Sequence, residues 1–300
     1  MKLEFPFLID GGLSTVLEKN GYNLNHKLWS ASLLESDPEA IIQAHLEYIQ
    51  AGAQCITTAS YQASIKSLEE AGYSSAEAER VFSQSVELGK AAIDRATVSG
   101  TINYRPLIAL SIGPYGAYLA DGSEYHGHYG ISNEELIKFH DRQIQLIDHT
   151  DADLFACETI PSFEEAKALR ELLTQTNKSG WVSFSCRNGK EVNDGTSIEK
   201  CVALFTDHPN VFAIGVNCTD PDYVAELIVA IKKEIRTKNI IVYPNSGECY
   251  DPKEKSWDGT FNSQHFIHLA KEWISLGADI IGGCCRIGPN HIRQLKEELG

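Results

Sequence analysis

The stretch Ile280-Ile281-Gly282-Gly283-Cys284-Cys285-Arg286-Ile287-Gly288-Pro289 has the pattern of a short buried strand that ends in a turn, and it carries two adjacent cysteines. A second stretch, Val211-Phe212-Ala213-Ile214-Gly215-Val216-Asn217-Cys218, has the same pattern and also ends in a cysteine. Short apolar runs bounded by turn residues are typical of strands in a parallel sheet. Because parallel strands end at the same edge, we expect these three thiols to converge.

The same pattern recurs along the chain and predicts the fold class. Apolar, β-rich runs cover residues 7–10, 54–60, 107–114, 153–159, 181–186, 211–218, 240–246 and 280–285, and helix-like sequence follows each of them. Helix-start signals stand at 36–39 and 132–135, and further helical sequence covers 260–275. This alternation favours an α/β protein with a (β/α)8 TIM-barrel architecture. No linker or low-complexity segment divides the chain, so we expect residues 1–300 to form a single domain.

Composition excludes several classes of partner. The formal net charge of −15 repels phosphate backbones and argues against nucleic acid, whereas it favours a cationic substrate. No apolar run approaches the roughly 20 residues of a membrane span, and residues 1–9 do not resemble a secretory signal. Eight cysteines without such a signal indicate a reducing compartment. We therefore expect a cytoplasmic protein with small-molecule partners.

Polar or reactive side chains stand at the predicted strand ends: Asp10, Thr57, Ser60, Glu158, Asn217, Cys218, Asn245, Cys284 and Cys285. Active sites of β/α barrels are assembled at the carboxyl ends of the strands. The long segments 115–130 and 247–257 follow predicted strands and are expected to be loops on that face. The distribution therefore predicts a binding site there.

Three converging cysteines are compatible with more than one role. Three thiolates leave one corner of a zinc tetrahedron free, which is a feature of catalytic zinc sites. The alternatives are simple packing, because cysteine is often buried, and a disulfide from Cys218 to Cys284 or Cys285 under oxidation. The isolated cysteines are expected to be packing residues; they are Cys55, Cys157, Cys186, Cys201 and Cys249.

Three segments carry a resemblance to a known family. Residues 8–13 (LIDGGL), 215–218 (GVNC) and 282–292 (GGCCRIGPNHI) resemble the hallmark segments of the homocysteine S-methyltransferase family, and the likeness extends over about 7–295. Residues 156–162 (ACETIPS) resemble the family segment whose glutamate binds the amino acid. The chain is most similar to the stand-alone branch that uses S-methylmethionine or S-adenosylmethionine.

The resemblance implies a TIM barrel in which Cys218, Cys284 and Cys285 bind Zn²⁺ and homocysteine sulfur takes the fourth position. It also implies that Glu158 binds the substrate ammonium, with the Asp10-Gly11-Gly12 segment at the same amino acid. From the residues alone, Glu158 fits a structural ion pair equally well, and 10–12 fits an ordinary turn. Metal coordination would deprotonate the substrate thiol, so no general base is required.

Three further side chains are candidates for substrate binding. Gln62, Asn217 and Asn245 can either bind ligand polar groups or satisfy backbone groups at strand ends. The segment 120–129 combines acids with aromatic rings, which suits a sulfonium cation, and is otherwise a solvated loop. We assign no metal to His126 and His128 within it.

One departure from the family pattern follows Glu158 directly. Betaine-dependent relatives have a tyrosine after the glutamate, and this chain has Thr159. We therefore expect water, and not a tyrosine, as the temporary zinc ligand when substrate is absent. The resemblance implies a zinc-dependent methyltransferase that takes a methyl group from a sulfonium donor and gives methionine, and we expect a monomer or weak homo-oligomer. The alternatives are betaine as donor, or a non-catalytic barrel whose thiols or zinc sense redox state.

Overall fold

Eight parallel strands form one sheet in the order β1-β10-β7-β6-β5-β4-β3-β2. The computed structural model describes residues 3–24, 28–251, 256–258 and 263–299. The strands are β1 (Phe7–Leu8), β2 (Cys55–Thr57), β3 (Leu107–Ile112), β4 (Leu154–Ile160), β5 (Gly180–Phe184), β6 (Val211–Asn217), β7 (Asn239–Tyr243) and β10 (Ile280–Ile281). Each lies within, or within one residue of, a run that the sequence predicts as a strand.

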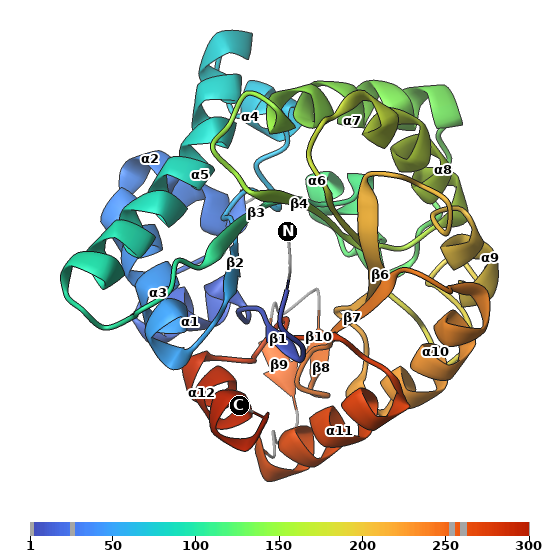
Figure 1. The fold of residues 1–300 in the computed structure, drawn as a ribbon. Helices are drawn as coiled ribbons and strands as arrows, with labels where there is room; N and C mark the ends of the chain where they lie inside the picture. Colours follow the sequence, from blue (N-terminus) through green and yellow to red (C-terminus); the bar gives the residue numbers. More distant parts are fainter. Residues whose placement is uncertain (1–2, 25–27, 252–255, 259–262, 300) are drawn as a thin grey trace.

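The sheet closes into a barrel between its first and last strands. Ile9, just past β1, forms a parallel bridge with Cys55 of β2. The Asp10 N–H donates to the Cys55 carbonyl at 3.1 Å, and the Gln54 N–H donates to the Leu8 carbonyl at 2.7 Å. Figure 1 shows the helices arranged as a ring outside these strands. The predicted (β/α)8 barrel is thus confirmed.

The described helices alternate with the strands. They are α1 (Leu13–Lys19), α2 (Leu33–Ser36), α3 (Pro38–Ala51), α4 (Ile65–Glu70), α5 (Ser75–Val98), α6 (Tyr115–Leu119), α7 (Asn133–Ile147), α8 (Phe163–Leu172), α9 (Ile198–Ala203), α10 (Pro221–Glu234), α11 (Ser263–Leu276) and α12 (Pro289–Leu299), with short 3₁₀ turns η1 (Trp29–Ser32), η2 (Ser123–Tyr125) and η3 (Leu173–Gln175). Among the described helices, none combines the length and apolarity needed to cross a bilayer.

Helix caps explain two of the predicted boundaries. Asp37 accepts from the Ala40 N–H at the start of α3, and Ser132 forms a capping box with Glu135 at the start of α7. The third predicted helix is observed as α11, although its expected start at residue 260 lies outside the described residues.

Two apolar clusters divide the interior. The larger fills the space between the barrel and the helices, and the smaller lies inside the barrel, with Ala109, Ala156, Trp181 and Ile241 among its members. Because side chains alternate across a strand, the residues two positions further on also point inward. Those residues are Ser111, Glu158, Ser183 and Tyr243. The barrel core therefore changes from apolar to polar at the carboxyl ends of its strands.

Both expected loops contain short regular elements. Segment 115–130 holds α6 and η2, and segment 247–257 includes β8 (Cys249–Asp251) and β9 (Ser256–Asp258), which pair as an antiparallel hairpin. Elements of three to five residues are too short to leave a periodic signal in the sequence.

Candidate metal centre and substrate cavity

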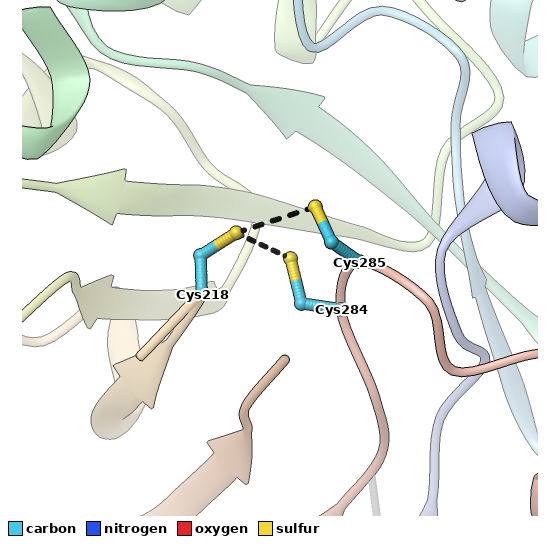
Figure 2. Close-up of side chains that lie close together, drawn as sticks. All are labelled: Cys218, Cys284 and Cys285. Carbon is cyan, nitrogen blue, oxygen red and sulfur yellow. Dashed lines mark hydrogen bonds between the residues drawn. The ribbon is translucent and has the colours of Figure 1, made fainter. Parts of the chain in front are cut away.

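The three predicted cysteines converge at the carboxyl end of the barrel. Cys218 directly follows β6, and Cys284 and Cys285 lie in the turn after β10. The Cys218 Sγ is 2.8 Å from the Cys284 Sγ and 3.7 Å from the Cys285 Sγ. Figure 2 shows the sulfur atoms pointing toward one another from the two segments. All three ligand atoms lie within 4.8 Å of one another.

The end of β7 and the residues after it form hydrogen bonds to both cysteine turns. This is possible because β7 lies between β6 and β10 in the sheet. The Cys218 N–H donates to the Tyr243 carbonyl at 3.3 Å, and the Cys284 N–H donates to the adjacent Pro244 carbonyl at 2.8 Å. The Ser246 N–H donates to the Cys285 carbonyl at 3.2 Å. One short stretch of backbone thus sets the relative positions of all three thiols.

The Asp10-Gly11-Gly12 segment packs against the cysteine turn. The Gly283 N–H donates to the Asp10 carbonyl at 3.0 Å. A Cβ atom on Gly12 would lie 2.6 Å from the Cys284 carbonyl oxygen, and one on Gly11 would lie 2.2 Å from the Ile287 carbonyl oxygen. Both glycines are therefore required by contact between two backbone segments that are far apart in the sequence.

The donor set fits a tetrahedral metal ion. Zinc–sulfur bonds of about 2.3 Å place ligand sulfurs just under 4 Å apart in a tetrahedron. The Cys218–Cys285 separation of 3.7 Å is close to this distance, whereas the Cys218–Cys284 separation of 2.8 Å is shorter and would have to widen around an ion. Contacts from the Cys284 thiol, and then from the Cys285 thiol, lower the pKa of Cys218 well below its usual value. Cys218 is consequently the thiol most easily ionised to a metal ligand. Three sulfur ligands suit zinc and leave one position open.

The cysteines line a cavity of about 470 Å³. Gly11, Gly12, Gln62, Glu158, Asn217 and the three cysteines, all predicted as site residues, contribute to its wall. The wall also contains aromatic rings and carboxylates, namely Tyr22, Trp29, Tyr61, Tyr125, Tyr243, Glu18, Asp121, Glu124 and Glu158. Among the described residues of the wall, none is Lys, Arg or His. The cavity is therefore suited to a ligand that brings positive charge.

Glu158 projects from β4 into the barrel mouth. The Ser111 hydroxyl donates to its Oε1, and the Tyr243 hydroxyl donates to its Oε2 at 3.1 Å. Burial raises the pKa of Glu158 to about 7 despite these two hydrogen bonds. Trp181 Nε1 in turn donates to the Tyr243 hydroxyl at 3.0 Å, which fixes the position of that ring. A cationic ligand would offset the cost of the buried carboxylate.

Asn217 connects β6 to β4. Its Oδ1 accepts from the Thr159 N–H at 2.7 Å and from the Ser183 hydroxyl at 2.8 Å, and its Nδ2 donates to the Thr159 hydroxyl at 2.8 Å. Thr159 has a φ of 61°, which is unusual for a β-branched residue. Asn217 thus supports the backbone directly after Glu158, and one amide hydrogen remains for a ligand.

Two predicted site residues do not line the cavity. Asp10 is buried, and its carboxylate accepts from the Thr57 N–H at 2.8 Å and from the Thr57 hydroxyl at 3.0 Å. Burial raises the pKa of Asp10 well above its usual value. The Asn245 Oδ1 accepts from the Gly247 N–H at 3.0 Å within its own turn. Their assignment as substrate ligands stays a prediction.

Three residues that contact the key groups are not individually predicted from the sequence, although Tyr125 belongs to the segment 120–129, whose aromatic rings are expected to suit a sulfonium cation. The Tyr125 hydroxyl lies 3.7 Å from the Cys218 Sγ, so a tyrosine from η2 approaches the metal centre although Thr159 follows Glu158. Ser111 and Tyr243 hold the Glu158 carboxylate. For the latter two, the alternation of side chains along β3 and β7 was the available signal. Cys55, Cys157, Cys186 and Cys201 are free and buried, and the side chain of Cys249 lies outside the described part of the chain.

Unusual backbone conformations cluster at the cavity. Five described non-glycine residues have positive φ: Trp29, Ala120, Thr159, Cys218 and Arg286. The first four line the cavity, and Arg286 directly follows Cys285. Residues held in such conformations concentrate at functional sites.

The fold and the site define a (β/α)8-barrel protein with a cluster of three cysteines, able to hold a metal ion, in an acidic cavity. The family model described as homocysteine S-methyltransferase matches residues 7–299, and the chain belongs to this family. A relative from Bacillus subtilis, homocysteine S-methyltransferase YbgG, is 44% identical over 97% of this chain and 94% of its own length. The selenocysteine Se-methyltransferase of Brassica oleracea var. italica is 42% identical over 97% of this chain and 88% of its own length.

A solved structure agrees with the fold. The metallated form of the homocysteine methyltransferase MmuM from Escherichia coli superimposes with a TM-score of 0.87 and 38% identity. The match covers 97% of this chain and 95% of that chain. The barrel and the order of its elements are therefore shared along nearly the whole length.

Proposed function

We propose that the protein transfers a methyl group from a sulfonium donor, S-methylmethionine or S-adenosylmethionine, to the sulfur of L-homocysteine and forms methionine. The observation that carries this proposal is the convergence of Cys218, Cys284 and Cys285 in the wall of an acidic cavity. The names of the relatives and the metallated neighbour support it.

Each group of the chain has a defined task in this reaction. Cys218, Cys284 and Cys285 would hold Zn²⁺ and leave one ligand position for substrate. The bound ion would lower the pKa of the homocysteine thiol, so that the thiolate is available at neutral pH. Glu158 accepts hydrogen bonds from the substrate ammonium, and Ser111 and Tyr243 keep its carboxylate in place.

The methyl transfer itself needs no acid from the protein. The electron pair of homocysteine sulfur forms the new S–CH₃ bond, while the electron pair of the breaking bond returns to the donor sulfur. The donor leaves as a neutral thioether, so no proton has to be supplied. The protein contributes alignment of the two sulfurs with the methyl carbon. We further propose that one domain carries the reaction, in the cytoplasm and as a monomer or weak homo-oligomer.

A parallel donor assay tests the proposal. Reduced, zinc-loaded protein is offered homocysteine with S-methylmethionine, S-adenosylmethionine or betaine, and methionine is measured. We expect one zinc per chain and methionine formation with at least one sulfonium donor. Turnover with betaine alone would replace the donor assignment, and a preference for selenohomocysteine would replace the acceptor assignment.

The Cys218→Ser variant separates catalysis from a structural role of the metal. We expect near-complete loss of methyl transfer with an unchanged circular dichroism spectrum, because the apolar barrel does not depend on one thiol. Unfolding of this variant would indicate a structural clasp. Full turnover by metal-free protein would exclude every role assigned to zinc.

A further inference from the structure

Two buried acceptor atoms in the cavity wall have no hydrogen-bond partner among the described residues. They are the Gln62 Oε1 and the Glu124 Oε2. Gln62 is 9% exposed, so water does not readily replace the missing donor. An acceptor left unpaired in a protein interior costs free energy and calls for a ligand donor or a positive charge.

Gln62, in the turn after β2, and Glu124, in η2, both contact the short helix α6. The Gln62 Nε2 donates to the Ala117 carbonyl of α6 at 3.4 Å, which fixes the amide orientation and leaves Oε1 free. A Cβ on Gly116, the preceding residue, would lie 2.3 Å from the Glu124 backbone nitrogen, so η2 packs directly on α6. Gln62 and Glu124 are therefore both positioned by α6 in the wall of the same cavity.

The unpaired oxygens of Gln62 and Glu124 lie on the side of the three cysteines and are distinct from the carboxylate of Glu158. The hydroxyl of Tyr125, the residue after Glu124, lies 3.7 Å from the Cys218 Sγ. Glu158, in contrast, has protein donors on both of its oxygens. Burial raises the pKa of Glu124 to about 7, and its Oε2 has no hydrogen-bond partner among the described residues. The cavity thus has a second acidic half on the η2 side.

The ligand of this half must bring its own positive charge, because the described wall contains no basic side chain. Tyr61 and Tyr125 line the cavity near Glu124. Their aromatic rings attract onium cations. A sulfonium amino acid combines a cationic sulfur with ammonium N–H donors. The cationic sulfur can balance the charge of Glu124, and the ammonium can donate a hydrogen bond to Gln62.

We propose that Gln62 and Glu124 form the methyl-donor half of the cavity. The Glu124 carboxylate balances the charge of the sulfonium sulfur, and the Gln62 Oε1 accepts a hydrogen bond from the donor ammonium. The inference rests on the proposed function and assigns the Glu158 half to the acceptor amino acid. The sulfonium sulfur of the donor and the sulfur of homocysteine would then face each other next to the three cysteines.

This role has a kinetic signature. The sulfonium charge disappears as the methyl group moves, so a fixed carboxylate stabilises bound donor more than the transition state or the neutral product. Removal of the carboxylate should therefore raise the donor KM without lowering kcat. A residue that only supports the fold would change both parameters or the stability.

The test compares the Glu124→Gln variant with wild-type protein, both zinc-loaded. Methyl transfer is measured against S-methylmethionine and S-adenosylmethionine, and inhibition is measured with the carbon isostere of S-methylmethionine, in which a CH group replaces the sulfonium sulfur. We expect the KM for the preferred donor to rise by about 10- to 100-fold, the range of a contact to a charged group. Inhibition by the neutral isostere should change little.

Two controls complete the experiment. Glu164→Gln removes an exposed carboxylate of α8 that pairs with Lys167, and its kinetics should match wild type. Gln62→Leu should raise the donor KM and leave the homocysteine KM unchanged. An unaltered donor KM in Glu124→Gln, or an equal loss of affinity for the neutral isostere, would overturn the inference. If wild-type protein accepts no sulfonium donor, the proposed function itself fails.

Discussion

Glu158 is a buried carboxylate in the wall of the cavity. Glu158 is 8% exposed and has a pKa near 7 because burial disfavours its charged form. A carboxyl group whose pKa is raised on folding contributes stability that is fully present below its unfolded pKa. That stability is lost as the pH rises through the folded pKa. For Glu158 the window runs from about pH 4.5 to 7.

The Glu158→Gln variant should therefore be more stable than wild type above neutral pH. We expect its free energy of unfolding to exceed that of wild type by about 3 kcal/mol at pH 8, and the difference to disappear near pH 4.5. Denaturant unfolding of the reduced, metal-free proteins measures this difference. Asp10, whose pKa is raised mainly by burial, is also affected by the Glu158 charge, so part of the difference between the two proteins comes from Asp10. A constant difference across the range would contradict the assigned pKa.

Backbone contact at Gly12 gives a second test at a single residue. Gly12→Ala would place a methyl group 2.6 Å from the Cys284 carbonyl, and neither backbone can move freely. We expect a loss of about 1–3 kcal/mol in unfolding free energy and weaker metal retention. Gly288→Ala is the matched control, because its Cβ would lie 3.6 Å from the Thr15 side chain, an ordinary contact. Equal stability of the two variants would exclude the predicted clash.

At the scale of elements, one buried glutamate anchors the segment that carries Glu124 and Tyr125. The Glu165 Oε1 accepts from the Tyr115 N–H at 2.6 Å and lies 2.8 Å from the His140 Nε2. Its Oε2 accepts from the Tyr129 hydroxyl at 3.0 Å. Glu165 thus ties both ends of segment 115–130 to α7 and α8.

Glu165→Gln should loosen this segment. The new amide group is neutral and has one acceptor oxygen where the carboxylate had two, so the three contacts are weakened or rearranged, and we expect a cost of about 1–3 kcal/mol. Chymotrypsin cleavage after the tyrosines of segment 115–130 should become faster, as mass spectrometry of the fragments can show. Glu164→Gln changes the adjacent exposed carboxylate and should be cut at the wild-type rate. Resistance of both variants to the same degree would refute the anchoring role.

The sequence predicts regular elements better than it predicts side-chain directions. All eight strands and the capped helices α3 and α7 follow from apolar runs and capping signals, which are local. The convergence of the cysteines follows from strand order alone. The placement of Asp10 against Thr57 and the approach of Tyr125 to Cys218 depend on rotamers and on packing between distant segments. No local pattern encodes those contacts.

At the scale of the whole molecule, barrel closure brings the two ends of the chain to one site. Strand β1 pairs with β10, and residues just past these strands form the wall around the cysteines. The candidate metal ligands lie directly after β6 and in the turn after β10, with β7 between the two strands. A bound ion would therefore connect segments that the sheet holds only through an intermediate strand.

Removal of metal should lower thermal stability without loss of the barrel. An ion that binds the native state alone stabilises it in proportion to the logarithm of its concentration over its Kd, about 3–4 kcal/mol in strong excess. For a chain of this size we expect the Tm to fall by roughly 5–10 °C after chelation under reducing conditions. Calorimetry with and without zinc measures the shift, and circular dichroism below the transition should be unchanged. Cys218→Ser should show a much smaller zinc-dependent shift, whereas a shift equal to that of wild type would mean that the ion binds elsewhere.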